Sequence, residues 1–135
     1  MSRYVVAEWR LATESLGAAL VCRRAGYHRD AVSRTYYAVL HAAKAALQLH
    51  DVDAESHAAV RRLFGKHIVR TGLVEVEWGS VIGQIADRRM ISDYDATRTF
   101  DEADAHEAYE RAEAFLARLR TLLAERIPLE DLEEG

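Results

Sequence analysis

An arginine and a histidine lie seven residues apart in a segment, residues 27–49, that contains no glycine or proline and is predicted to form one helix. At about 100° per residue, this step falls about 20° short of two full turns, so Arg34 and His41 share one face. A guanidinium group binds phosphate oxygens through a fixed fork of donors, and imidazole accepts and donates protons near neutral pH. The pair therefore suits phosphodiester cleavage without a metal ion.

The same pair also has a purely structural interpretation, because amphipathic helices commonly carry Arg and His on their exposed faces. The two adjacent tyrosines help to separate the faces. Tyr36 falls on the apolar stripe and is expected in the core, whereas Tyr37 lies near the face of Arg34 and His41. There its hydroxyl can form a hydrogen bond, or its ring can stack.

The rest of the chain predicts a single all-α domain. Half of its 135 residues are apolar or aromatic, 30% are charged, and there is one proline. Alanine, leucine, arginine and glutamate, which all favour helix, are abundant. We predict an up-and-down bundle of four or five helices over residues 1–126, followed by an acidic, frayed C-terminal tail over residues 127–135. The expected helices cover residues 3–24, 27 or 29–49, 57–69, 80–89 and 101–126.

Individual residues support these elements. Gly26 is expected to end the first helix, and Ser56 to cap the third. We expect the lone Cys22 to be a small core residue. The segment Asp93-Tyr94-Asp95 is expected to form an ordered loop that caps the last helix or packs Tyr94 against residues 27–49. The predicted core contains apolar and aromatic residues from four helices: Trp9, Tyr36, Leu40, Leu63, Phe64, Phe115 and Leu119.

Charge is distributed unevenly along the chain. Residues 1–72 contain 11 Lys and Arg against 6 Asp and Glu, and residues 73–135 contain 7 against 16. A basic half suits phosphate binding, although two solvated faces of a bundle would look the same. No segment resembles a signal peptide or approaches the roughly 20 apolar residues of a membrane span. We therefore predict a cytoplasmic protein with no membrane association.

The sequence offers no pattern for a cofactor. The remaining histidines lack the spacing of metal ligands on one helix, and Cys22 has no cysteine partner. A metal site at Asp53 and His57 is conceivable but weakly supported. Gly79 and Gly83 match no phosphate-binding loop. We therefore predict neither a cofactor nor a metal.

The run from Ala25 to Leu47, with Tyr36-Tyr37-Ala38 followed by His41-Ala42-Ala43, resembles the HEPN domain (higher eukaryotes and prokaryotes nucleotide-binding). Later segments match its small stand-alone bacterial and archaeal branch. They are Ser56-His57, the run Val69 to Gly72, and Arg88-Arg89 followed by Ser92 to Asp95. The similarity extends over about residues 10–123.

This resemblance implies a helical bundle that usually forms a homodimer, and a signature of Arg, four to six residues, then His. Arg34 and His41 enclose six residues and fit it. In nuclease-active members the pair is thought to cleave RNA where two protomers meet. Carried over, His41 is the general base or acid, and Arg34 holds the phosphate. The residues expected to bind ligand or support the pair are Ser33, Tyr37, Lys44 and His57.

Two positions depart from the family pattern. Thr35 follows Arg34, where active members commonly have Asn, Asp or His. Ala43 stands where one branch, regulated by a nucleotidyltransferase antitoxin, carries a modified Tyr, so that mechanism does not transfer by position. Two hypotheses remain. One is a metal-independent ribonuclease of toxin–antitoxin type. The other is a non-catalytic subunit that presents nucleotide or substrate to a minimal nucleotidyltransferase.

Overall fold

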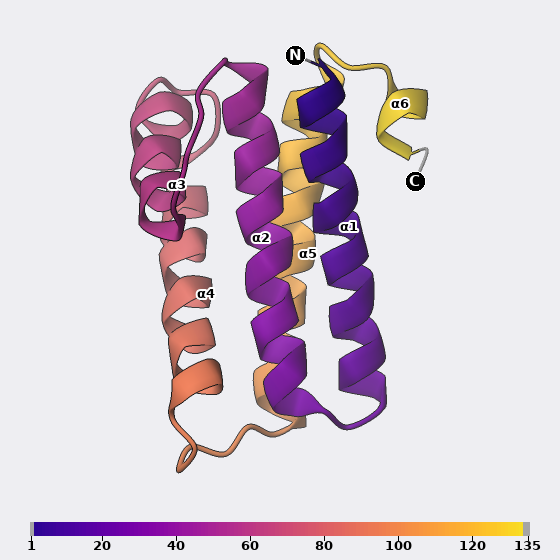
Figure 1. Cartoon of the computed structure of the whole chain (residues 1–135), viewed down its shortest axis with the longest axis vertical. Helices are drawn as coiled ribbons and strands as arrows, with labels where there is room; N and C mark the ends of the chain where they lie inside the picture. The colour runs from indigo at the N-terminus through magenta and orange to yellow at the C-terminus, as the bar shows by residue number, and fades with distance from the viewer. Residues whose placement is uncertain (1, 134–135) are drawn as a thin grey trace.

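The computed structural model describes residues 2–133, which form helices joined by loops (Figure 1). The predicted all-α class is confirmed. No helix within this part of the chain is long and apolar enough to cross a membrane. The elements, in chain order, are α1 (Ser2–Arg24), α2 (His28–Leu49), α3 (His57–Phe64), the π-helical turn η1 (Gly65–Val69), α4 (Val76–Tyr94), α5 (Glu102–Ala124) and α6 (Leu129–Glu133).

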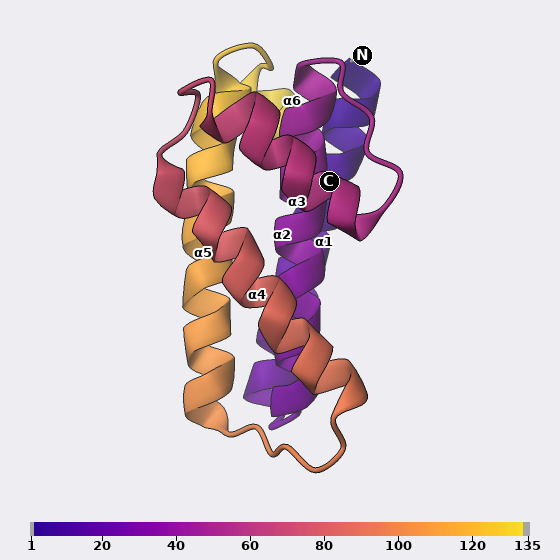
Figure 2. The ribbon, with the colours of Figure 1, turned by 90° about the vertical axis from the view of Figure 1, so that its left-hand side faces the viewer.

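Helix α2 is the centre of the bundle and contacts α1, α3, α4, α5 and η1. In Figure 1 it lies in front of α5, with α1 on one side and α3 and α4 on the other. Figure 2 shows α4 crossing this group obliquely. Small side chains let neighbouring helices approach α2 closely, and five of its alanines are fully buried. They are Ala38, Ala42, Ala43, Ala45 and Ala46.

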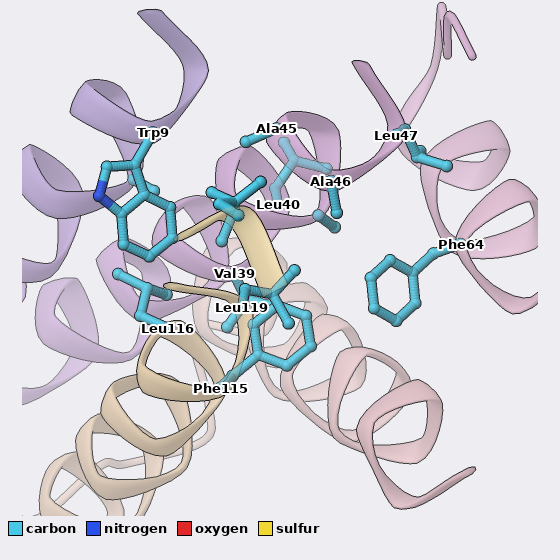
Figure 3. Packing of buried hydrophobic residues seen from close by; sticks show 14 of the residues in the cluster. Trp9, Val39, Leu40, Ala45, Ala46, Leu47, Phe64, Phe115, Leu116 and Leu119 are labelled. Atoms are coloured by element: carbon cyan, nitrogen blue, oxygen red, sulfur yellow. The ribbon is translucent and has the colours of Figure 1, made fainter. Parts of the chain in front are cut away.

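The core lies between α1, α2, α5 and the α3–α4 pair (Figure 3). Phe115 and Phe64 are fully buried, with ring centroids 5.7 Å apart. Of the core residues predicted from sequence, only Leu63 is partly rather than fully buried. Burial at this level stabilises a large side chain by about 1.5–3 kcal/mol. Cys22 is only half-buried, so it contributes less to the core than its apolar neighbours suggest.

Helix ends follow the expected chemistry at three places. Gly26 adopts φ +85°, the left-handed conformation that glycine tolerates best, and this ends α1. Ser56 caps α3, its hydroxyl oxygen accepting a hydrogen bond of 3.1 Å from the Ala59 N–H. Asp101 and Asp104 form a reciprocal capping box at the start of α5.

Helix α4 extends beyond the predicted range 80–89 at both ends, so Gly79, which was expected in the preceding loop, lies inside it together with Gly83. A Cβ atom at Gly79 would lie 3.5 Å from a methyl carbon of Val69, and one at Gly83 would lie 2.6 Å from a guanidinium nitrogen of Arg61. Gly83 therefore lets the Arg61 side chain lie close against α4, whereas a side chain at Gly79 would make only an ordinary van der Waals contact with η1. The expectation for residues 93–95 is wrong as well. Tyr94 ends α4, is 71% exposed, and neither caps α5 nor packs against α2.

Arg29, in the first turn of α2, holds the end of α4 and the loop that follows it. Its guanidinium group donates to the carbonyl of Ser92 at 2.6 Å and to that of Asp95 at 3.0 Å. It also bonds the Arg98 carbonyl and lies 5.0 Å from the ring centroid of Phe100. Carbonyls at a helix C-terminus lack partners within the helix, so a cation there satisfies them. Arg29 thereby fixes the distance between α2 and α4.

The C-terminal segment is ordered up to Glu133, in contrast to the frayed tail predicted from sequence. Ile127 and Leu132 are buried, and α6 packs against α1. Arg120 forms an ion pair with Glu133. The acidic residues of this segment mask its two apolar anchors when composition alone is considered.

Candidate functional site

Beyond its first turn, α2 leaves a single row of residues unburied. Successive members are separated by three or four residues, so they form one continuous strip on the helix surface. We call this row the α2 stripe, and it consists of Arg34, Tyr37, His41, Lys44 and Gln48. A helix packed on its other faces thus presents its predicted functional residues together.

Arg34 is the exposed end of the stripe. No Asp or Glu among residues 2–133 lies within ion-pair distance of its guanidinium group, which lies 4.5 Å from the ring centroid of Tyr37. Seven residues of helix separate Arg34 from His41 by about 10 Å along the axis. Tyr37 spans this interval, because it contacts Arg34 and lines a pocket with His41. Tyr37 therefore lies between the two side chains, and Arg34 itself does not line that pocket.

Glu8, on α1, orients His41. The Glu8 carboxylate lies 2.7 Å from Nδ1 of His41 and 3.3 Å from Nζ of Lys44. Burial of this carboxyl group raises its pKa, but the hydrogen bond from His41 and the charge of Lys44 outweigh burial, and the pKa of Glu8 lies below its ordinary value. An ionised carboxylate only accepts hydrogen bonds, so Nδ1 carries the proton in this contact. Nε2 of His41 is then left to exchange a proton with a ligand.

The lowered pKa of Glu8 makes stability depend on pH. Its contribution is fully present above the ordinary Glu value of 4.5 and is lost as the pH falls through the lower folded value. We expect the difference in Tm between wild type and Glu8→Gln to shrink as the pH is lowered from about 6 to about 3. Calorimetry measures this directly. A difference that stays constant over this range contradicts the pairing.

Arg89, from α4, closes the other side of the stripe. Its guanidinium group donates to the Tyr37 hydroxyl at 3.4 Å and lies 5.0 Å from the ring centroid of Tyr36. Asp93, one turn further along α4, pairs with Nε of Arg89 at 2.9 Å. The two adjacent tyrosines of α2 are thus held by a cation from a helix more than 50 residues away in sequence.

His57, the first residue of α3, brings a second imidazole to the site. Its ring centroid lies 5.5 Å from that of Tyr36 and 6.2 Å from that of Tyr37. Burial against these rings lowers the pKa of His57, and the charge of Arg89 lowers it further. With His41, His57 lines a pocket of about 200 Å³ whose wall also includes Lys44 and Ser56.

Two residues beside Arg34 are placed differently. Ser33 borders the α2 stripe but is 9% exposed, so it supports this turn of the helix rather than facing a ligand. Thr35 is fully buried, and its hydroxyl donates to the Val32 carbonyl at 2.7 Å. Its side chain faces Ile85 and Ala108 on the interior side of α2. Thr35, one of the two positions that depart from the family pattern, therefore does not reach the stripe.

Sequence reasoning missed Glu8 and gave Arg89 no role of its own. One feature of the sequence could have indicated Glu8. It lies three residues after Val5 and four before Ala12, so helical spacing places it on the same face of α1 as these buried residues. A carboxylate at such a position needs a partner. No local sequence pattern could have indicated Arg89, because its contacts with the tyrosines arise only where α4 crosses α2. No group of three His, Cys, Asp or Glu residues converges as a metal site requires within residues 2–133.

Comparison with known proteins identifies the class of protein. The model of the HEPN domain matches residues 6–122, and the chain belongs to this family. A Methanocaldococcus jannaschii protein named "Putative toxin" is 35% identical over 115 residues, which cover 85% of each chain. A second protein of that name from the same organism is 28% identical, covering 83% of this chain and 76% of its own. A UPF0332 protein of Pyrococcus horikoshii is 41% identical over 66 residues, 49% of this chain and 46% of its own.

Proposed function

We propose that this HEPN protein is a metal-independent endoribonuclease of toxin–antitoxin type, with Arg34 and His41 as its catalytic pair. The observation that carries the proposal is the α2 stripe, where an arginine without a carboxylate partner in the described chain and a Glu8-oriented histidine flank Tyr37. The toxin names of two relatives support the biological setting. Lys44 and His57 add positive charge and a second imidazole beside the pair.

The proposed reaction uses the RNA's own 2′-hydroxyl as nucleophile. Nε2 of His41 removes its proton, and the resulting oxygen attacks the adjacent phosphorus. The bond from phosphorus to the 5′-oxygen breaks, and that oxygen takes a proton from an imidazolium. The products are a 2′,3′-cyclic phosphate and a 5′-hydroxyl end. Arg34 binds the phosphate and stabilises the charge that builds on its oxygens, while Glu8 stabilises the imidazolium formed on His41.

We further propose that the site is completed in a homodimer. One Arg and one His provide a phosphate clamp and one proton carrier, whereas two copies provide both an acid and a base. Two-fold contacts are the commonest way to assemble identical chains. We expect light scattering at micromolar concentration to give the mass of a dimer. In that dimer we expect the α2 stripes of the two protomers to line one cleft. A monomer, or an interface that keeps the stripes apart, contradicts this arrangement.

The test of the proposed function is cleavage of single-stranded RNA in the presence of EDTA. We expect cleavage to persist, to leave 2′,3′-cyclic phosphate ends, and to weaken as salt competes for phosphate contacts. Growth arrest in cells that express the chain alone is the matching observation in vivo. If the protein binds RNA or nucleotide but never cuts, the nuclease proposal fails. The alternative, a non-catalytic partner of a minimal nucleotidyltransferase, then takes its place.

Arg34 variants test the phosphate clamp. We expect Arg34→Ala to lower both RNA affinity and turnover, because the phosphate loses its bidentate partner. Arg34→Lys should rescue poorly, since lysine keeps the charge but loses the fork. The assay is steady-state cleavage combined with binding to a non-cleavable RNA. Arg24→Ala, which removes an exposed arginine at the end of α1, is the control and should leave both measurements unchanged. Full rescue by lysine would contradict bidentate binding.

A further inference from the structure

A second, larger cavity lies beside the α2 stripe, where α2, α3 and α4 meet. Its volume is about 410 Å³, within the range of pockets that hold small molecules. The floor is apolar and comes from all three helices. It is made by Val39, Leu40, Val60, Ile82 and Ala86.

The rim of this cavity is cationic and aromatic. Arg61 and Arg62 on α3 are exposed, and no carboxylate within residues 2–133 pairs with either. Gly83 lets Arg61 lie across to α4, since a Cβ atom there would lie 2.6 Å from its guanidinium nitrogen. Tyr36 of α2 and His57 of α3 also line the cavity with their rings, as does Arg89, whose guanidinium group lies 5.0 Å from the Tyr36 ring centroid. The cavity therefore combines an apolar floor, stacking surfaces and cations that are available to an anion.

This cavity adjoins the pocket that contains His41. Leu40, His57 and Val60 line both, so the two share a wall rather than lying on separate faces. A ligand that fills the cavity and extends past His57 arrives at His41. The arrangement suits a strand in which one group is buried and the next group along is held at the catalytic pair.

We propose that the cavity binds one unpaired nucleobase of the RNA strand, next to the phosphate that is cleaved. The inference rests on the proposed function. A base has apolar faces, which suit the floor and the rings of Tyr36 and His57, and the phosphate of its nucleotide suits Arg61 and Arg62. A base within a duplex is stacked on both sides and paired at its edge, so it cannot enter. The cavity therefore makes the protein selective for single-stranded RNA.

Binding of a 2′-O-methyl RNA oligonucleotide, which cannot be cleaved, provides the test. Ala86→Leu fills the cavity with a residue that favours helix, and we expect it to weaken binding by about tenfold. Ala114→Leu, the same change at an exposed position of α5, should leave binding within about twofold. Arg61→Ala should also weaken binding, and a duplex of the same sequence should bind Ala86→Leu and wild type equally.

An oligonucleotide with abasic sites separates the cavity from the phosphate contacts. We expect wild type to bind it about as weakly as Ala86→Leu binds the intact strand, and Ala86→Leu to lose nothing further. Equal binding of intact and abasic strands by wild type would overturn the proposal, as would unchanged binding by both Ala86→Leu and Arg61→Ala. The readout does not require catalysis. A protein that shows base-dependent binding but never cuts therefore retains the cavity assignment and loses the nuclease assignment.

Discussion

We expect His41→Ala to reduce RNA cleavage by about 10²–10⁴-fold or more while the fold remains intact. The side chain is 21% exposed and, within residues 2–133, hydrogen-bonds to Glu8, so its loss removes the proton carrier and little packing. Initial rates on single-stranded RNA measure the effect, and circular dichroism checks the fold. His106→Ala is the matched control, because His106 lies on α5 and lines neither pocket.

The outcome discriminates between the two hypotheses for this family member. If His41→Ala cuts as fast as wild type, His41 is not the source of any nuclease activity in the preparation. If neither protein cuts and both bind RNA equally, the stripe is a binding surface. Thr35 would then be examined first, as the position that departs from active members. Because Thr35 is buried on the interior side of α2, a substitution there would affect cleavage by changing helix packing rather than by changing a ligand contact.

The second large effect concerns stability. We expect Phe115→Ala to lower the free energy of unfolding by about 3–5 kcal/mol. Phe115 is fully buried, and its ring lies 5.7 Å from that of Phe64 and 6.2 Å from that of Trp78. Truncation leaves a cavity where α5 meets α3 and α4, and these helices cannot close it without losing other contacts. Urea unfolding measures the change.

Val76→Ala is the control for this experiment, because Val76 is 77% exposed and should change stability by no more than about 0.5 kcal/mol. A loss below about 1 kcal/mol for Phe115→Ala would mean that the core relaxes around the deletion. The assignment of Phe115 to the centre of the bundle would then need revision.

Sequence periodicity predicted the helices well where the signal is local. The apolar spacing of residues 27–49 defined α2, and Gly26 and Ser56 marked helix ends. It failed where packing overrides local preference. Gly79 indicates a loop in isolation, but the packing of α4 on α3 and η1 keeps residues 76–94 in one helix. The acidic tail hides Ile127 and Leu132 for a similar reason.

The same division applies to the candidate site. The shared face of Arg34, Tyr37, His41 and Lys44 follows from helical geometry, so it was predictable. The contact between Glu8 and His41, the position of Arg89 over Tyr36, and the cavity between three helices depend on how helices cross. Those crossings depend on the whole core, and a one-dimensional pattern does not encode them.

The α2 stripe also has an evolutionary consequence. The faces of α2 that hold the bundle together are buried, and the face to which we assign the chemistry is only partly buried. Under the proposed function, substitutions at Arg34, the exposed end of the stripe, therefore alter reactivity at small thermodynamic cost, whereas those at His41 also remove a contact with Glu8. Proteins that descend from this fold could therefore lose catalysis and keep binding, or lose binding and keep catalysis, while the helical bundle stays the same. The melting temperature of a descendant would then not show whether it had retained catalysis or binding.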